Sequence, residues 1–517
     1  MNLIDFNRPK KCQIAIDDQE LVSVDFSSQK GSFNDVQLEF IKSEFGYDLL
    51  VKSERKKISH IYLTYDLSIG EEERSFGDSF ERTYGDVTWT KPSSRLLYYW
   101  YFFIKNTKQK RVNGYGVKVQ PHSIVSFRLK NNQLIVDVNT QSGGCGVNLK
   151  GRLLNATTFI QESYQYDVLE TALKRFTKKL MGDIKPRPVP QPVYGFNNWY
   201  YAYGVSSYEL VLEDTKLLAE VTKGLKNRPF MVIDDGWSIE SASGPWVTND
   251  RFKDMSLLVK EMKKYDVRPG LWFRPLMDKS EELKEHRHPL EKDWYDLSSK
   301  EVLDKVTKDV KMFVNWGFEL IKFDYMTYDT FHYYGFNMPE EICPQGWHYE
   351  DDSLTNAELT LRLYQTIRDA APNAILIGCN AIGHLCAGIV ELNRIGDDTS
   401  GREWDRTLKM GVNTLAYRLI QNHNFYVVDA DCVGITGLID WKQNRQWLDL
   451  LAYSGSPLFI SCDPRIVSEE IKKDMQKAFK INEKQENNCY PIDVDDNFTP
   501  HQWCVDGKLR EFDWHLK

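Results

Sequence analysis

The sequence predicts a mixed α/β protein: a (β/α)8 TIM barrel preceded by an N-terminal β-sandwich and followed by a short C-terminal β extension. Short β-prone runs fill the first part of the chain, a segment with alternating prolines follows, and eight apolar runs then alternate with amphipathic stretches. Repeated strand-then-helix units are typical of a closed parallel barrel. We expect a sandwich at 1–163, a helical and Pro-rich linker at 164–192, the barrel at 193–481 and the C-terminal β segment at 482–517.

The N-terminal region has the pattern of many short strands. Runs such as 60–65 and 97–104 are rich in β-branched and aromatic residues, and turn clusters such as 130–132 separate them. Short strands with few helical periods predict a β-sandwich. The polar, glycine-punctuated segment 77–86 does not fit a strand. It could reach over the mouth of the barrel or lie in solvent, and its composition favours the solvated loop.

The linker and the barrel follow in order. Residues 164–181 have a helical pattern, and prolines at 186, 188, 190 and 192 then force an extended segment, which marks the domain boundary. The eight predicted barrel strands are 193–199, 230–235, 270–275, 320–325, 374–379, 389–395, 425–429 and 457–462. After residue 482, Tyr490, Ile492 and Trp503 lie in β-like surroundings, which predicts a few short strands.

Composition excludes several function classes. The chain has 66 basic and 74 acidic residues, a net charge of −8 and no basic run, so we expect no nucleic-acid partner. It has no apolar stretch long enough to cross a bilayer and no signal-like N-terminus, so we expect a cytoplasmic protein without a membrane partner. Nine cysteines without close pairs predict neither a zinc site nor a disulfide framework. Without an H-x-H pair or a Gly-rich phosphate loop, we expect no metal and no cofactor.

Polar residues cluster where the predicted strands end, which is the face on which barrel active sites are assembled. Lys322 and Asp324 are two apart on the fourth strand, so their side chains point the same way. A neighbouring cation favours the ionised carboxylate that a nucleophile requires. The alternative is a buried structural ion pair.

Asp397 and Asp398 follow the sixth strand after Gly396. Adjacent carboxylates repel each other, so one of them can hold its proton at neutral pH, as a general acid must. The alternative interpretation is an N-cap for the helix at 404–408. Two opposed carboxylates among aromatic rings are what glycoside cleavage needs.

The second strand ends in Asp234 and Asp235, with Trp237 close behind. Carboxylates accept hydrogen bonds from vicinal sugar hydroxyls, and an indole ring can stack on the apolar face of a sugar. A turn with an Asp cap is the alternative. Trp199 and Trp272, at the ends of the first and third strands, could form further walls or pack in the core.

Four motifs in this order resemble glycoside hydrolase family 36 of clan D, the α-galactosidases and raffinose-synthase relatives. They are Gly-Phe-Asn-Asn-Trp at 195–199, Asp-Asp-Gly-Trp at 234–237, Lys-x-Asp at 322–324 and Arg-Ile-Gly-x-Asp-Thr at 394–399. The resemblance implies a retaining mechanism in which Asp324 forms a covalent galactosyl intermediate. Asp398 would be the acid/base, with Asp397 as the alternative.

The same resemblance implies substrate-binding roles. Asp234 and Asp235 would hold the C4 and C6 hydroxyls, and Lys322 would contact ring hydroxyls. Arg394 would reach toward the C2 hydroxyl or support the acid/base. Trp199 and Trp272 would line the pocket, and Cys379 would be the small fifth-strand residue near C2.

The partner implied is an α-galactoside oligosaccharide or glycoconjugate, and family analogy favours a homo-oligomer. We expect the carboxyl groups of Asp324 and Asp398 to be roughly 5–6 Å apart, as retention requires. Two alternatives share the clan: galactosyl transfer, and hydrolysis of α-N-acetylgalactosaminides. The alternative of another class is an inactive galactoside-binding barrel, which we would expect to have lost Lys322 or one of the two carboxylates.

Overall fold

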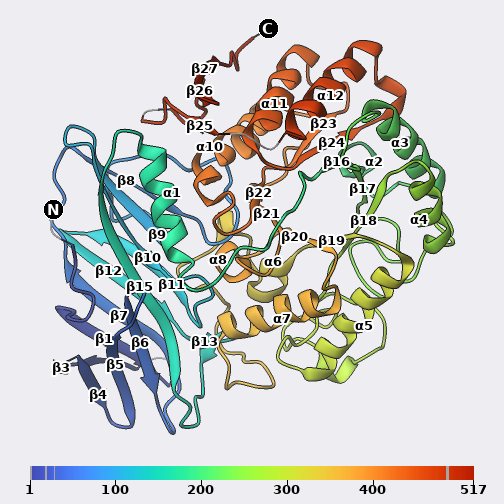
Figure 1. The fold of residues 1–517 in the computed structure, drawn as a ribbon. Helices are drawn as coiled ribbons and strands as arrows, with labels where there is room; N and C mark the ends of the chain where they lie inside the picture. The colour runs from blue at the N-terminus through green and yellow to red at the C-terminus, as the bar shows by residue number, and fades with distance from the viewer. Residues whose placement is uncertain (1–2, 18–19, 28, 485–487, 496, 517) are drawn as a thin grey trace.

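The computed structural model describes residues 3–17, 20–27, 29–484, 488–495 and 497–516. It combines a large antiparallel sheet, a curled parallel sheet with helices outside it, and a small C-terminal sheet (Figure 1). Among the described residues, no helix has both the length and the apolar character needed to cross a bilayer.

The N-terminal region forms one antiparallel sheet of thirteen strands, in the order β2-β1-β7-β12-β11-β9-β10-β15-β6-β5-β4-β3, with β8 paired to β9. The prediction was a β-sandwich, and in the structure hydrogen bonding joins these strands in one continuous antiparallel sheet. The two edge regions of the sheet lie close together. Gly31 in β4 is so near to β2 that a Cβ atom added to it would lie 2.6 Å from Val24 Cγ1. The strands are β1 (Lys11–Ile16), β2 (Glu20–Val24), β3 (Phe26–Ser27), β4 (Lys30–Phe33), β5 (Val36–Lys42), β6 (Tyr47–Lys52), β7 (Ile58–Asp66), β8 (Glu73–Asp78), β9 (Leu97–Asn106), β10 (Arg111–Val117), β11 (Ile124–Lys130), β12 (Gln133–Asn139) and β15 (Leu154–Gln165). A separate hairpin pairs β13 (Gln141–Ser142) with β14 (Cys145–Gly146).

Alternation of apolar and polar residues gives this sheet its core. In β12, Leu134, Val136 and Val138 are buried, and the residues between them are partly exposed. Successive strand residues point to opposite faces, so such a strand buries one face and leaves the other available to solvent. Helix α1 (Leu169–Leu180) packs on the sheet, where the Phe176 ring occupies the space above Gly114.

The parallel sheet has nine strands in the order β22-β21-β20-β19-β18-β17-β16-β24-β23. Each of the eight predicted strand regions overlaps one of them, and β23 was not predicted. The end strands β22 and β23 are separated in the chain by only two residues, Ala430 and Asp431. The bounds are β16 (Tyr194–Asn197), β17 (Phe230–Ile233), β18 (Arg268–Phe273), β19 (Leu320–Phe323), β20 (Ile375–Gly378), β21 (Leu392–Arg394), β22 (Val427–Asp429), β23 (Cys432–Ile435) and β24 (Leu458–Cys462).

The helices between these strands begin at polar caps. Ser207 accepts a hydrogen bond from the Leu210 N–H, and Thr355 forms a reciprocal capping box with Glu358. Several of the longer helices lie on the outer side of the curled sheet (Figure 1). The helices are α2 (Trp199–Ala202), α3 (Tyr208–Val221), α4 (Met255–Lys264), α5 (Lys300–Trp316), α6 (Met326–Phe331), α7 (Asn356–Ala370), α8 (Gly383–Cys386), α9 (Trp404–Thr407), α10 (Thr414–Arg418), α11 (Trp441–Ser454) and α12 (Glu469–Asn482).

The C-terminal segment forms a three-stranded antiparallel sheet of β25 (Cys489–Pro491), β26 (Gln502–Val505) and β27 (Lys508–Glu511). The buried Trp514 ring donates to the Pro500 carbonyl, and Trp404 donates to the Trp514 carbonyl over 2.6 Å. This sheet therefore packs against the region that follows the sixth parallel strand.

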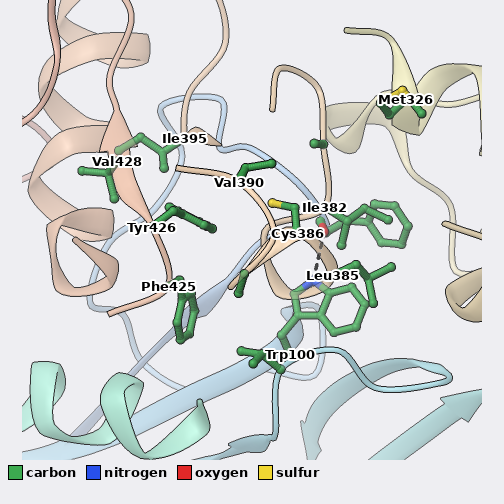
Figure 2. Close-up of a cluster of buried hydrophobic side chains, with 14 of the residues drawn as sticks. Trp100, Met326, Ile382, Leu385, Cys386, Val390, Ile395, Phe425, Tyr426 and Val428 are labelled. Atoms are coloured by element: carbon green, nitrogen blue, oxygen red, sulfur yellow. Dashed lines mark hydrogen bonds between the residues drawn. The ribbon is translucent and has the colours of Figure 1, made fainter. Parts of the chain in front are cut away.

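An apolar cluster joins the antiparallel sheet to the parallel-sheet unit (Figure 2). Trp100 of β9 lies among side chains such as Leu385 and Phe425, and its indole donates to the Phe80 carbonyl over 2.9 Å. The Trp100 ring also stacks on His384 with a centroid distance of 5.2 Å. The N-terminal sheet is therefore packed tightly against the second unit.

A buried ion pair crosses the same interface. The Arg418 guanidinium of α10 donates to Asp78 Oδ1 over 2.8 Å, and Gln421 donates to Asp78 Oδ2 over 2.9 Å. We expect Asp78→Ala to lower the free energy of unfolding by about 3–5 kcal/mol, because Arg418 would be left buried without its carboxylate. Urea unfolding followed by tryptophan fluorescence measures this. Glu72→Ala, which breaks the exposed Lys108–Glu72 pair, is the matched control and should change little. Equal effects of the two substitutions would contradict the prediction.

Candidate active site

A cavity of about 240 Å³ lies where the parallel strands end. Eight of the predicted site residues line it, and both Asp324 and Asp398 are among them. The lining residues are Arg82, Trp199, Asp234, Asp235, Ala242, Trp272, Lys322, Asp324, Tyr325, Tyr334, Phe336, Asn380, Asp397 and Asp398.

Asp324 directly follows β19, and its carboxylate is held by two donors. Trp272 Nε1 donates to Oδ2 over 3.0 Å, and the Tyr325 N–H donates to Oδ1 over 2.7 Å. Tyr325 has a φ of 63°, a left-handed conformation that is uncommon outside glycine. Such backbone conformations persist where the surrounding structure holds them, so the orientation of this carboxylate is fixed.

Asp234 follows β17 and lies deep in the cavity. Its Oδ2 accepts from Lys322 Nζ and from Asn197 Nδ2, each over 2.7 Å. Lys322 is thus hydrogen-bonded to Asp234 rather than to Asp324. Burial alone would lower the pKa of Lys322, but Asp234 and the neighbouring Asp324 raise it well above its usual value. Lys322 is therefore a cation between two carboxylates.

Asp235 has a different environment from its neighbour. Its carboxylate accepts from Ser241 Oγ over 3.0 Å and from the Ala242 N–H over 2.9 Å. Burial raises the pKa of Asp235, and these two hydrogen bonds oppose the rise. Trp237, which was expected to stack on a sugar, is wholly buried away from the cavity, and its indole donates to the Trp272 carbonyl over 2.9 Å. Because its side chain has no exposed surface for a ligand to cover, Trp237 serves the core.

Asp397 and Asp398 are each paired with arginine. Arg82 and Arg406 bind the two oxygens of Asp397 over 2.8 and 2.7 Å, and Arg394 donates to Asp398 Oδ1 over 2.9 Å. The capping alternative is not what forms, since the residue at the start of α9 is Glu403 and its side chain makes no capping bond.

Mutual repulsion was expected to keep one of these carboxyls protonated, and for Asp398 the structure corrects this. Partial burial favours the neutral acid, but Arg394, Arg82 and Lys322 outweigh it and hold the pKa of Asp398 below its usual value. The two cations with the largest effect on this pKa, Arg394 and Arg82, come from β21 and from the N-terminal region. The adjacent Asp-Asp pair in the sequence does not reveal that these two cations lie near it.

Arg394 and Cys379 lie behind the cavity wall. Arg394 is 3% exposed, donates to Asp398 Oδ1 over 2.9 Å and forms an ion pair with Asp431 Oδ2 at 2.9 Å. Cys379 Sγ lies 3.9 Å from Arg394 Nη1 and is also buried. Of the two roles implied for Arg394, this position favours support of Asp398.

The segment 77–86 is not a solvated loop. Glu81 and Thr83 are buried, and the Thr83 N–H donates to the Ile395 carbonyl over 2.9 Å while its carbonyl accepts from the Asp397 N–H over 3.1 Å. This backbone pairing places Arg82 in the cavity wall. The polar composition that favoured solvent instead serves buried contacts with residues more than 300 positions away.

Sequence reasoning also missed three aromatic residues of the cavity: Tyr325, Tyr334 and Phe336. Tyr325 ends a predicted strand directly after Asp324, so its place in the cavity could have been predicted from that position. Tyr334 and Phe336 lie in the loop after α6, and no spacing rule distinguishes them from ordinary loop residues. Among the described residues, no group of three or more His, Cys, Asp or Glu side chains is placed to hold a metal ion.

No protein-family model matches the chain, and no curated protein matches its sequence. Solved structures match its fold. The α-galactosidase from Thermus thermophilus in complex with p-nitrophenyl α-D-galactopyranoside has a TM-score of 0.62 at 15% identity, over 92% of this chain and 99% of that one. The galactosidase domain of an α-galactosidase–sucrose kinase gives 0.64 at 14% identity, over 97% and 74%. The family 36 α-galactosidase AgaB from Geobacillus stearothermophilus gives 0.63 at 13% identity, over 96% and 79%. The chain therefore has the fold of the family 36 α-galactosidases.

Proposed function

We propose that the protein is a retaining glycoside hydrolase that removes terminal α-linked galactose from α-galactosides. The observation that carries this proposal is that Asp324 and Asp398, from different strands, line one cavity of about 240 Å³. This volume lies below the roughly 300–1,000 Å³ of pockets for drug-sized ligands, and it suits one monosaccharide unit. The solved structures with this fold include the Thermus enzyme bound to stachyose, which supports a galactoside as the ligand.

In the proposed mechanism, Asp324 attacks the anomeric carbon and forms a galactosyl ester. The donors Trp272 Nε1 and the Tyr325 N–H keep the attacking oxygens in place. Because the low pKa of Asp398 leaves it ionised at neutral pH, Asp398 must first take up a proton; it then gives this proton to the leaving oxygen and afterwards takes one from the water that hydrolyses the ester. The carboxylates and the ammonium group of Lys322 exclude a purely apolar ligand from the base of the cavity.

The recognition of galactose is assigned to the polar base. Asp234 and Asp235 would accept hydrogen bonds from the C4 and C6 hydroxyls, and Lys322 would donate to a ring hydroxyl. Trp199 and Trp272 form walls of the cavity. We further propose that the nine-stranded parallel sheet closes as an eight-stranded barrel, in which its two edge strands β22 and β23, consecutive in the chain, together form one interrupted barrel strand.

A panel of nitrophenyl α-glycosides tests the proposal on the wild-type protein, Asp324→Asn and Asp398→Asn. We expect the wild-type protein to cleave the α-galactoside with retention of configuration. NMR of the first-formed sugar measures this configuration. A product of inverted configuration, or a stronger response to another α-glycoside than to the galactoside, would reject it.

Arg82 gives a prediction about pH. A general acid must be protonated, so kcat/KM for a poor leaving group falls as pH rises through the pKa of Asp398. Arg82 contributes to the low pKa of Asp398 and also neutralises Asp397. We expect Arg82→Met to raise that pKa and to move the alkaline limb of the pH profile to higher pH. Arg82→Lys keeps the charge and should move the limb less. A shift to lower pH in Arg82→Met would contradict the assignment.

A further inference from the structure

Asp431 lies behind Asp398, in the break between the two edge strands of the parallel sheet. Strand β22 ends at Asp429 and β23 begins at Cys432, so the break is two residues long. Asp431 is 2% exposed and is not part of the cavity lining. Its φ of 74° is left-handed, a conformation that Asp and Asn adopt more readily than most other non-glycine residues. The Asp431 N–H donates to Asp429 Oδ1 over 3.0 Å, which holds the turn in place.

One oxygen of Asp431 binds donors from three parts of the chain. Its Oδ2 accepts from the Tyr200 hydroxyl of α2, from the Thr399 N–H over 2.7 Å and from Thr399 Oγ1 over 2.9 Å. The same oxygen forms an ion pair with Arg394 of β21 at 2.9 Å. A buried carboxylate is costly unless it is paired and hydrogen-bonded, and Asp431 meets both conditions.

Two of these partners, Arg394 and Thr399, also determine where Asp398 lies. Arg394 donates to Asp398 Oδ1 over 2.9 Å, and Thr399 is the next residue in the chain. The side chain of Asp398 is 39% exposed, so packing alone does not fix its orientation. Its carboxylate is held by Arg394 and its backbone through Thr399, and both of these contacts lead back to Asp431.

We propose that Asp431 is a positioning residue for the acid/base: by holding Arg394 and Thr399, it keeps the Asp398 carboxyl directed at the cavity. This inference rests on the proposed function, in which Asp398 transfers the proton, and adds to it a residue that acts without touching the substrate. A carboxylate that only stabilised the fold would affect every substrate equally. A positioning residue affects most the substrates that need the acid.

Asp431 also offsets the charge of Arg394. Partial burial raises the pKa of Asp398, and Arg394 is the cation with the largest opposing effect. A carboxylate 2.9 Å from Arg394 weakens this effect and adds its own repulsion toward Asp398. Removing the charge of Asp431 should therefore lower the pKa of Asp398 further, which is the direction opposite to that expected for Arg82→Met.

Other titratable groups face the two carboxylates from several elements. Asp398 is surrounded by Arg82, Lys322, Arg394, Tyr200, Tyr203 and Tyr325, and its neighbour Asp397 is paired with Arg82 and Arg406. Asp431 is faced by Arg394, Tyr200, Asp429 and Cys432. Burial raises the pKa of the three tyrosines and of Cys432, so none of them gains a charge near neutral pH. Burial also raises the pKa of Asp429, and its titration is present in the wild-type protein as well.

Asp431→Ala tests the positioning with two substrates that differ in their need for an acid. An α-galactosyl disaccharide needs a proton on its leaving oxygen, whereas α-galactosyl fluoride needs little acid assistance. We expect the ratio of kcat/KM for the disaccharide to kcat/KM for the fluoride to fall on the order of 10–100-fold, because a displaced acid loses its alignment with the leaving oxygen. A smaller fraction of folded protein lowers both values and leaves the ratio unchanged.

Asp431→Asn tests the charge with little change in shape. Asn tolerates the left-handed conformation, and its amide oxygen can still accept from Tyr200 and Thr399. We expect the alkaline limb of the kcat/KM profile for the disaccharide to move to lower pH. If Asp431→Ala does not fold, this variant decides the question by itself.

Asp463→Ala and Asp463→Asn are the matched controls, because Asp463 also follows a parallel strand and pairs with an arginine, Arg465, outside the cavity lining. Both should keep the wild-type ratio and pH profile. An unchanged ratio in Asp431→Ala at the wild-type melting temperature would overturn the inference, as would an alkaline limb in Asp431→Asn that stays in place or moves to higher pH. If Asp398→Asn itself showed no dependence on the leaving group, the proposed role of Asp398 would be wrong and this inference would fall with it.

Discussion

Replacing Asp324 by Asn is expected to reduce turnover of α-galactosides by roughly 10⁴-fold or more, because the substitution removes the nucleophile. The amide has nearly the same size as the carboxylate, and its oxygen can still accept from Trp272 Nε1. We therefore expect the melting temperature and the affinity for galactose to stay close to wild-type values. Steady-state kinetics with p-nitrophenyl α-galactoside, together with a thermal melt, measure both properties.

Asp324→Gly adds a test that loss of activity alone does not provide. The shortened side chain leaves space for azide, which can attack the anomeric carbon from the same side as the missing carboxylate. We expect azide to restore cleavage of an activated galactoside and to yield the β-galactosyl azide, the inverted product. Asp235→Gly, another carboxylate of the cavity, is the control and should show no rescue. Rescue in the Asp235 variant and not in the Asp324 variant would show that Asp324 is not the nucleophile.

The sequence predicted the strand regions of the parallel sheet because their signal is local. A strand such as β17, Phe230–Ile233, is apolar throughout, and polar residues follow where it ends. The same pattern brought Asp234, Lys322, Asp324 and Asp398 into one candidate site. These residues lie at strand ends, which adjacent parallel strands bring to the same edge of the sheet.

The parts that sequence reasoning missed depend on contacts that are distant in the chain. Thr83 pairs with Gly396, so a segment with the composition of a surface loop becomes buried and carries Arg82 into the cavity. Polar residues that form hydrogen bonds within the protein have the same sequence pattern as polar residues that form hydrogen bonds with water. The prediction that Trp237 stacks on a sugar was wrong for a related reason. Its position beside two aspartates does not show whether its ring is exposed or buried.

The adjacent Asp397 and Asp398 show that the charges around a residue also cannot be predicted from its sequence neighbours. Their repulsion is evident in the sequence, whereas Arg82, Arg394 and Arg406 enter only through the fold. With these cations present, Asp397 is enclosed by two arginines, and Asp398 has one direct partner and a side chain that is 39% exposed. That difference favours Asp398 as the residue that exchanges protons with substrate and water.

Asp398→Asn should therefore have an effect that depends on the leaving group. A disaccharide needs a proton on its leaving oxygen, and we expect its kcat/KM to fall on the order of 10²–10⁴-fold without the acid. Fluoride departs with little need for a strong acid, so the first step with α-galactosyl fluoride should be much less affected. Pre-steady-state measurement of fluoride release separates that step from hydrolysis of the ester, which also needs Asp398.

Asp397→Asn distinguishes the two neighbours. Its oxygens bind Arg82 and Arg406, so we expect a smaller loss that is similar for the disaccharide and the fluoride. If the dependence on the leaving group appeared in Asp397→Asn and not in Asp398→Asn, the acid/base role would belong to Asp397. In that case Arg394, which binds Asp398 and Asp431, would hold a structural carboxylate, and the expected shift of the pH profile in Arg82→Met would come from loss of the direct Arg82–Asp397 pair.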